Sequence, residues 1–192
     1  MATKNIMIVG VGGQGSLLAS RILGNAVLLK GYDVKVSEVH GMSQRGGSVV
    51  TYVKYGDKVA SPVICKGEAD IIMSFELLEA ARWLPFLKKD GVIITNTQQI
   101  NPMPVVTGAA EYPEDLVAKM QAAGAKVIAA DALAIAREAG NEKAVNVALI
   151  GLMANALGFD TETLHEAIRM SVPEKFLELN MKAFELGAAH NV

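Results

Sequence analysis

The residues best suited to chemistry form a glycine-rich turn near the start of the chain. A short apolar run, residues 6–9, leads into Gly10-Val11-Gly12-Gly13-Gln14-Gly15-Ser16, and a helical pattern follows over residues 17–29. Strand, Gly-x-Gly-x-x-Gly and helix is the order found in phosphate-binding turns. The first N–H groups of a helix lack backbone partners and carry the positive end of the helix dipole, which favours an anion there. The pattern therefore predicts either an anion site or a turn that serves packing alone. The candidate ligand residues are Gly10, Gly12, Gly13, Gln14, Gly15 and Ser16.

Each of the three spaced glycines has an expected role. Gly10 permits a tight turn, Gly12 lets the backbone approach a ligand, and Gly15 lets the helix pack close to the strand. A nicotinamide-dependent enzyme would also need an acid near the end of the second strand, and Glu38 lies at that position. No other feature of the sequence supports hydride chemistry, so a surface role for this carboxylate is favoured.

A second candidate is the loop over residues 40–48, which reads His-Gly-Met-Ser-Gln-Arg-Gly-Gly-Ser. This composition makes a poor core and a surface rich in hydrogen-bond donors. Arg45 is suited to a bidentate contact with a phosphate or with a partner's carboxylate, and the alternative is a structural turn. We expect a role at a ligand or subunit interface rather than in direct catalysis. The candidate loop residues are Met42, Ser43, Gln44, Arg45, Gly46 and Gly47.

Three further side chains are of types that can have chemical roles. His40 has the pKa class of an acid–base catalyst, but no carboxylate partner is visible, so a structural role is favoured. Asn146 is expected to cap or pin a helix rather than bind a ligand. Cys65 lies beside Lys66, and an inert thiol is the better interpretation of this residue.

Length and charge limit the class of protein. The 192 residues, 51% of them hydrophobic, suit one domain over residues 1–192 with a sizeable core. The net charge of −2 argues against a nucleic-acid binder. Residues 1–67 hold eight Lys/Arg and three Asp/Glu, a balance of +5, whereas residues 68–192 hold ten and seventeen, a balance of −7. Positive charge around the glycine turn suits an anionic ligand or an acidic partner, and a solvated pattern without a role is the alternative.

The single cysteine limits the redox chemistry of the chain. One thiol forms no intrachain disulfide and cannot by itself provide a cysteine-based zinc site or an iron–sulfur cluster, so we expect no metal. It weakly favours a reducing cytoplasm. The sequence shows no signal-peptide pattern and no uncharged stretch suited to a membrane span, so we expect a cytoplasmic protein.

The elements that must position these residues alternate between strand and helix. Apolar and β-branched runs predict strands at residues 34–39, 49–55, 69–75, 92–95 and 126–130. The first of these should run parallel to residues 6–9. A turn after residue 55 predicts a hairpin with residues 58–60, and residues 88–91 predict another turn. Helical patterns cover residues 76–83, 113–123, 131–138 and most of the chain beyond residue 144. These elements predict an α/β, Rossmann-like three-layer domain with a mostly parallel sheet and a helical C-terminal third.

The glycine turn and the loop together resemble a known family. Gly-Val-Gly-Gly-Gln-Gly at residues 10–15 and His-Gly-Met-Ser-Gln-Arg-Gly-Gly at residues 40–47 are similar to the gamma-type subunit of 2-oxoacid:acceptor (ferredoxin) oxidoreductases. The similarity continues through residues 69–72, 76–82 and 146–158, and so covers nearly the whole chain. Within that group the loop most resembles the small (beta) subunit of indolepyruvate ferredoxin oxidoreductases.

The resemblance implies a specific chemistry and a division of labour. Such enzymes oxidatively decarboxylate a 2-oxoacid on thiamine diphosphate, pass electrons through iron–sulfur clusters to ferredoxin, and transfer the acyl group to coenzyme A. The thiamine and cluster sites belong to a large alpha subunit, so this chain is expected to bind no cofactor alone and to be inactive alone. The glycine turn would then either hold phosphates of coenzyme A or of another nucleotide, or serve helix–strand packing alone. The isolated chain is a candidate homodimer.

Other functions are also compatible with these residues. The same subunit role in a pyruvate or 2-oxoglutarate enzyme is one, and a free-standing NAD(P)-binding oxidoreductase is another. An adenylating enzyme would be expected to carry further arginines and paired Cys-x-x-Cys motifs, which the sequence lacks. The last alternative is a scaffold whose glycine turn binds nothing.

Overall fold

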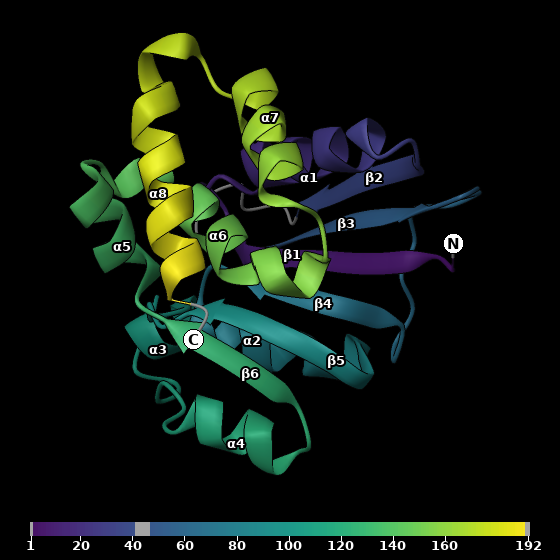
Figure 1. Ribbon diagram of the computed structural model, residues 1–192. Helices are drawn as coiled ribbons and strands as arrows, with labels where there is room; N and C mark the ends of the chain where they lie inside the picture. Colours follow the sequence, from purple (N-terminus) through teal and green to yellow (C-terminus); the bar gives the residue numbers. More distant parts are fainter. Residues whose placement is uncertain (1, 41–46, 191–192) are drawn as a thin grey trace.

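A six-stranded sheet lies between two layers of helices in the computed structural model, which describes residues 2–40 and 47–190 without the side chain of His40 (Figure 1). The strands are β1 (Lys4–Val11), β2 (Asp33–His40), β3 (Ser48–Gly56), β4 (Ala69–Ser74), β5 (Leu87–Asn96) and β6 (Lys126–Ala130). The helices are α1 (Ser16–Leu29), α2 (Leu77–Trp83), α3 (Met103–Val106), α4 (Leu116–Ala122), α5 (Ala132–Ala139), α6 (Val145–Leu157), α7 (Thr161–Ser171) and α8 (Leu177–Ala189). Short 3₁₀ turns are η1 (Leu84–Phe86), η2 (Glu142–Ala144) and η3 (Glu174–Phe176).

The sheet has the strand order β2-β3-β1-β4-β5-β6. β1, β4, β5 and β6 are parallel neighbours, whereas β3 is antiparallel to both β1 and β2. β2 therefore runs in the same direction as β1, as the sequence predicts, but β3 separates the two strands. The prediction of a mostly parallel sheet is confirmed. All carboxyl ends of the parallel strands, and the glycine turn after β1, consequently meet at one edge of the sheet.

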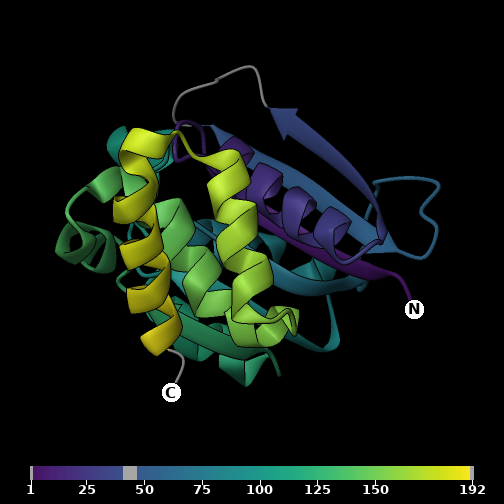
Figure 2. The same ribbon diagram turned by 45° about the horizontal axis from the view of Figure 1, so that its top comes forward.

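Two apolar cores explain the three layers. Alternate residues of β1 point to opposite faces, so Ile6 and Ile8 belong to one core while Met7 and Val9 belong to the other. The first core lies under α1, α5, α6, α7 and α8, and the second lies under α2 and α4 (Figures 1 and 2). The three-layer arrangement and the helical C-terminal third are therefore confirmed. No helix among the described residues is both long and apolar enough to cross a membrane.

α6 and α8 approach each other closely through two glycines. A Cβ atom added to Gly151 would lie 2.2 Å from the carbonyl oxygen of Phe184, and one added to Gly187 would lie 2.2 Å from the carbonyl oxygen of Ala148. Real Cβ contacts are longer than 3.0 Å. Only glycine at both positions therefore allows the two helix backbones to pack at this separation.

Two local predictions are wrong. Residues 58–60 form no strand, because β3 already has β1 and β2 as partners, and the Val59 N–H donates to the Asp33 carboxylate at 2.9 Å. Residues 88–91 belong to β5 rather than to a turn between elements, and they form an irregularity within that strand at which Asp90 adopts a positive φ of 66°. The pairing of β4 with β5 shifts register beside it.

Candidate functional site

The glycine turn after β1 is shaped by two residues with positive φ. Gly13 has a φ of 97° and Gly15 a φ of 92°, a region that side chains strongly disfavour. Gly10, expected to permit the tight turn, instead lies within β1 and pairs with Val49 of β3. A Cβ there would lie 2.9 Å from the Phe75 Cβ, so Gly10 serves close packing against the end of β4.

Hydrogen bonds within the chain hold this turn in place. The Gln14 side-chain oxygen Oε1 accepts the Val11 N–H at 2.7 Å, and its Nε2 donates to the Phe75 carbonyl at 3.3 Å. The Gly12 N–H donates to the Gly47 carbonyl at 2.9 Å, which joins the turn to the residue before β3. The turn is therefore ordered by its own contacts, and the donors left to a ligand begin after Gly12.

α1 begins at this turn without a side-chain cap. Gly15 is its N-cap residue, and no side chain accepts a hydrogen bond from the first turn of the helix. Asn146 of α6 donates from Nδ2 to the Gly15 carbonyl at 3.4 Å, while its Oδ1 accepts the Val147 N–H at 2.9 Å. The prediction that Asn146 pins a helix is confirmed. The close neighbour of Gly15 is thus α6 rather than the strand, and the start of α1 can accommodate an anion.

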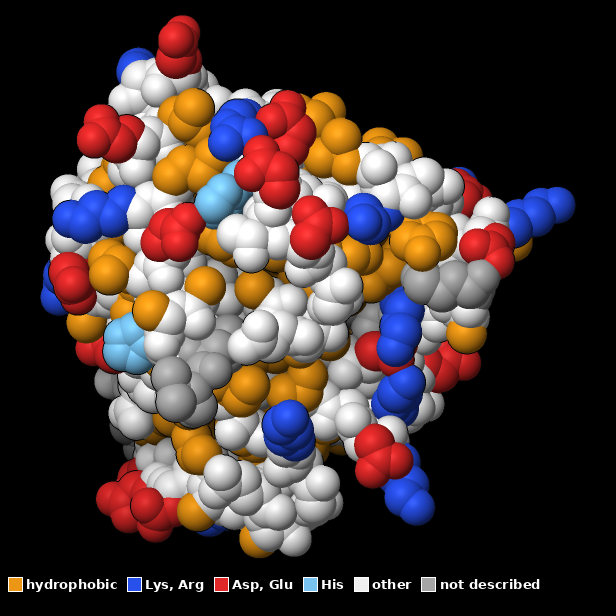
Figure 3. Space-filling model, viewed as in Figure 1, with side chains coloured by type: hydrophobic (Ala, Val, Ile, Leu, Met, Phe, Trp, Pro, Cys, Tyr) orange, Lys and Arg blue, Asp and Glu red, His pale blue; other side chains and the backbone are white. Residues whose placement is uncertain are grey.

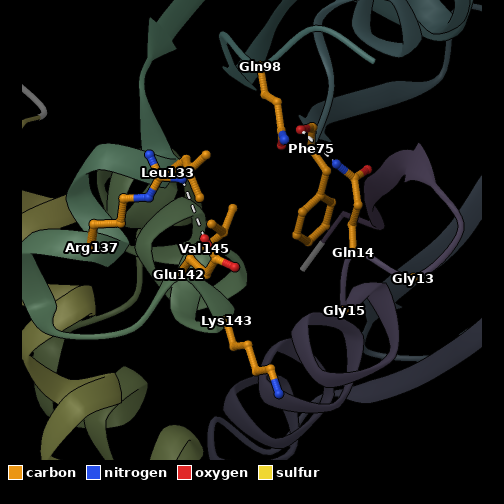
Figure 4. Close-up of a pocket in the computed structure, with 10 residues that line it drawn as sticks. All are labelled: Gly13, Gln14, Gly15, Phe75, Gln98, Leu133, Arg137, Glu142, Lys143 and Val145. Carbon is orange, nitrogen blue, oxygen red and sulfur yellow. Dashed lines mark hydrogen bonds and ion pairs between the residues drawn. The ribbon is translucent and has the colours of Figure 1, made fainter. Parts of the chain in front are cut away.

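A cavity of about 530 Å³ opens beside the turn. Gly13, Gln14 and Gly15 form one side, and Arg137, Glu142 and Lys143 form the other (Figure 4). The remaining lining residues are Phe75, Gln98, Leu133 and Val145. Figure 4 shows the Lys143 side chain extending toward α1, on the far side of the cavity from Gln98.

The charges in this cavity favour an anion. Arg137 Nη2 lies 3.4 Å from Glu142 Oε2, and both side chains are more than half exposed. The Lys143 amine has no ion-pair partner among the described residues, so it carries the uncompensated charge of the cavity. An exposed ammonium near an uncapped helix start is suited to a phosphate or a carboxylate.

A second hollow of about 480 Å³ lies on the other side of the same glycines. Gly12, Gly13, Gly15 and Ser16 line it together with Leu17, Glu38 and Val49. Its one acid, Glu38, is the residue that the nicotinamide interpretation singled out. Gly13 and Gly15 therefore line two hollows, one with Lys143 and the other with Glu38.

Two buried carboxylates, Glu76 and Glu79, lie at the start of α2. Glu76 is fully buried and accepts the Glu79 N–H at 2.8 Å and the Tyr112 hydroxyl at 2.5 Å. Burial, together with this hydrogen bond to Glu76, raises the pKa of Tyr112. Glu79 accepts the Ser48 hydroxyl at 2.5 Å and Arg82 Nε at 3.0 Å. Both carboxylates are satisfied within the chain, so they fix the start of β3 against α2 rather than offer a reactive group.

Several predicted residues lie beyond what the structure describes. His40 is the last residue of β2, and its side chain is outside the described part, as are Met42, Ser43, Gln44, Arg45 and Gly46. Their roles stay predictions. Gly47 is described, and its carbonyl contacts the glycine turn. The predicted turn and the end of the predicted loop are thus brought together.

Lys143 and Arg137 are not predicted from the sequence as residues of the site. They belong to the segment after β6, more than 120 positions beyond the turn. A segment that follows a parallel strand starts at the same edge of the sheet as the glycine turn. The order of strands and helices could therefore have placed the residues after β6 near this turn.

The charged surface is mixed rather than uniformly basic on the face shown in Figure 3, where acids and bases lie close together over α7 and α8. Arg169, for example, contacts Glu162 at 3.0 Å and Glu166 at 2.9 Å. Among residues 2–40 and 47–190, no group of three or more His, Cys, Asp or Glu side chains is placed to hold a metal ion.

Comparison with known proteins identifies the family. The family model for pyruvate ferredoxin/flavodoxin oxidoreductase matches residues 5–190. The chain belongs to this family. Among its curated relatives, the indolepyruvate oxidoreductase subunit IorB of Thermococcus kodakarensis is 48% identical, with 97% of this chain and 95% of that protein covered. The subunit of the same name from Archaeoglobus fulgidus is 40% identical, with 95% and 92% covered.

Two solved structures share the fold of this chain. The gamma subunit of a keto/oxoacid ferredoxin oxidoreductase from Geobacter sulfurreducens superposes with a TM-score of 0.73 at 24% identity, covering 98% of both chains. The 2-oxoglutarate:ferredoxin oxidoreductase of Magnetococcus marinus superposes with a TM-score of 0.74 at 17% identity. It covers 98% of this chain and 31% of that longer one, whose structure holds 2-oxoglutarate, coenzyme A and succinyl-CoA.

Proposed function

We propose that this chain is the small subunit of an indolepyruvate:ferredoxin oxidoreductase. The complex would convert an arylpyruvate anion, coenzyme A and two oxidised ferredoxins to the aryl-acetyl-CoA, CO₂, two reduced ferredoxins and one proton. Support for the substrate class comes from the relatives named as indolepyruvate oxidoreductase subunits, which are 36–48% identical to the chain over nearly its full length.

The chemistry would be centred on a large partner subunit. Thiamine diphosphate there would supply the electron sink for decarboxylation, and iron–sulfur clusters would carry the electrons to ferredoxin. Such clusters take four cysteines, and this chain has one, Cys65. The residues of this chain therefore do not fit a cluster, and its part in the reaction is to bind and orient.

The observation that carries the role of this subunit is the cavity between the start of α1 and Lys143. We infer that it receives phosphate groups of coenzyme A. The N–H groups after Gly12 would donate to the phosphate oxygens, because those of Val11 and Gly12 are already bonded within the chain. Lys143, on a separate element, would approach the same groups from the other side and so fix the orientation of the nucleotide.

The subunit assignment is tested by anaerobic purification of the tagged chain from its native cells. A large iron–sulfur partner should co-purify, and the complex should reduce a viologen dye in the presence of coenzyme A. Indolepyruvate should be used far better than pyruvate or 2-oxoglutarate. A preference for either of those acids would assign the same subunit role to another enzyme of the family, and a chain recovered alone would contradict the proposal.

The cavity is tested in that complex by Lys143→Ala. The KM for coenzyme A should rise about tenfold, which corresponds to about 1.4 kcal/mol for one lost charge–phosphate contact. The KM for indolepyruvate should stay unchanged, and Lys143→Arg should retain most of the affinity. Lys119→Ala, an exposed lysine on α4, is the matched control. An unchanged KM for coenzyme A in Lys143→Ala would show that this cavity does not bind coenzyme A. Binding of NADH by the complex would instead favour the nicotinamide alternative at Glu38.

A further inference from the structure

A smaller cavity, of about 150 Å³, adjoins the larger cavity beside the glycine turn. Three separate parts of the chain form it, namely Leu18 of α1, the segment around η2, and the segment that leads from Val172 into α8. Lys143 lines both cavities, so the two are adjacent at this side chain. A molecule with an anionic group at the Lys143 amine can therefore extend into the smaller cavity.

The walls of the smaller cavity are mostly apolar. Leu18, Val172 and Leu179 contribute aliphatic side chains, and Phe176 contributes an aromatic ring. Phe176 is 43% exposed, so packing within the chain leaves much of this ring available for contact. Lys175 Nζ lies 4.9 Å from the centroid of the same ring, which places a second cation close to the cavity. An apolar cavity of this volume holds a single aromatic ring.

One amide provides a polar group in these walls. Asn180 is only 6% exposed, and its Nδ2 donates to the Phe176 carbonyl at 2.8 Å. Because a carbonyl oxygen only accepts, this hydrogen bond fixes which way the amide faces. The Asn180 Oδ1 atom accepts no hydrogen bond from the described residues, although the polar groups of buried residues normally have partners. The cavity therefore offers a ligand one acceptor, together with the second N–H of the same amide.

We propose that the smaller cavity binds the adenine ring of coenzyme A, an inference that rests on the proposed function of the larger cavity. Adenine is flat and carries an amino donor next to a ring-nitrogen acceptor, the pattern with which an asparagine amide pairs. Its amino group would donate to Asn180 Oδ1, and its ring would contact the Phe176 ring. The phosphates attached to the ribose would then lie at the Lys143 amine, where the two cavities adjoin.

The sizes of the two cavities favour adenine over the indole ring of the substrate. An indole ring is also flat and has one N–H donor, so it would suit the smaller cavity by itself. The 2-oxoacid group attached to it is small, however, and would leave most of the larger cavity of about 530 Å³ empty. Coenzyme A joins its adenine to a long phosphorylated chain, and it therefore occupies both cavities.

This placement gives coenzyme A a direction across the chain. Lys143 and Gln98 lie on opposite sides of the larger cavity, with Leu133 and Phe75 on the two flanks between them (Figure 4). With the adenosine at Lys143, the pantetheine arm would pass between these two apolar side chains toward Gln98. Gln98 follows the end of β5, so the thiol would leave this chain at the carboxyl edge of the sheet.

The base contact is tested by calorimetry on the purified complex, without any substitution in the chain. The probe is the adenosine bisphosphate part of coenzyme A, without the pantetheine arm, and coenzyme A should displace it. An otherwise identical probe with unsubstituted purine should bind about tenfold more weakly, because it lacks the amino group that donates to Asn180 Oδ1. Equal affinities for the two probes, or displacement of the adenosine probe by indolepyruvate, would overturn the proposal.

The ring contact is tested by Phe176→Ala in the same complex. The dissociation constant of the adenosine probe should rise about tenfold, the usual effect of removing an aromatic side chain that contacts a base. Met170→Ala is the matched control, since it truncates a 56% exposed side chain outside both cavities. Co-purification of the large subunit would show that each variant chain is folded. If Lys143→Ala weakens binding of the probe but Phe176→Ala does not, the larger cavity binds coenzyme A and the adenine assignment is wrong. If neither change weakens it, both proposals fail.

Discussion

Gly151→Ala tests whether the close packing of α6 on α8 holds the site together. A helix-interior Gly→Ala change normally stabilises by about 1 kcal/mol, because alanine is the better helix former. Here the added Cβ would lie 2.2 Å from the Phe184 carbonyl oxygen and 2.8 Å from the Ala188 nitrogen. Both are backbone atoms, so no side-chain rotation relieves the overlap. The two helices must move apart.

The magnitude follows from that separation. An ordinary contact begins at 3.4 Å, so α8 must retreat by about 3.4 − 2.2 = 1.2 Å along this direction. A radial gap of this size forfeits about half of the dispersion attraction between the facing atoms. Overpacking of this kind costs about 1–3 kcal/mol, and a backbone obstacle places the cost near the upper limit. Even after the gain in helix propensity, Gly151→Ala should lower the free energy of unfolding by about 2 kcal/mol.

The assay is urea unfolding followed by circular dichroism, with Gly24→Ala as the matched control. Gly24 also lies inside a helix, but its added Cβ meets no atom within 4 Å, so Gly24→Ala should stabilise by up to about 1 kcal/mol. The same substitution should therefore have opposite signs at the two positions. Stabilisation by Gly151→Ala would refute the inference that backbone contact sets the helix separation.

Two further predictions concern the ends of α1 and α7. Gly15→Ala should lower the free energy of unfolding by about 2 kcal/mol, because its φ of 92° disfavours a side chain and its Cβ would lie 2.9 Å from Asn146 Nδ2. The cost should be about 1 kcal/mol smaller in an Asn146→Ala chain, and equal costs in the two backgrounds would contradict the contact. Hydrogen bonds from the Thr163 N–H and from Lys30 lower the pKa of Asp160 below 3.8. The stabilisation by this carboxylate is thus present above pH 3.8 and is lost as the pH falls below it. Below pH 3.8, the urea midpoint of Asp160→Asn should fall less steeply with decreasing pH than that of the unmodified chain. Equal slopes in the two chains would refute this assignment.

The sequence predicts those features of the fold that depend on local signals. The strand over Lys126–Ala130 and the helix capped by Asp131 were predicted correctly, since an apolar run and a capping carboxylate are both local. The end of α6 at Gly158, with a φ of 70°, is equally local. The position of β3 between β2 and β1 was not predictable in this way. Its apolar residues suit any buried strand, and only the pairing of distant segments decides its neighbours.

The site was predictable to a similar extent. The turn was found from glycine spacing, but the roles of its residues depend on distant partners. Gly10 is required by Phe75, and Gly15 by Asn146. Lys143 carries no motif of its own and enters the site only because α6 packs beside the start of α1. Spacing therefore located the turn, whereas the residues across the cavity depend on tertiary packing.

The two hollows beside the turn explain why a glycine motif alone does not identify a ligand. Gly13 and Gly15 line both hollows, so the same backbone donors face two different surroundings. The hollow that contains Lys143 carries an uncompensated positive charge, whereas the other contains the carboxylate of Glu38. A phosphate would be attracted to the first through the Lys143 amine. We therefore expect an anion on the side that Lys143 and α6 complete, and this preference is set by residues that the motif does not include.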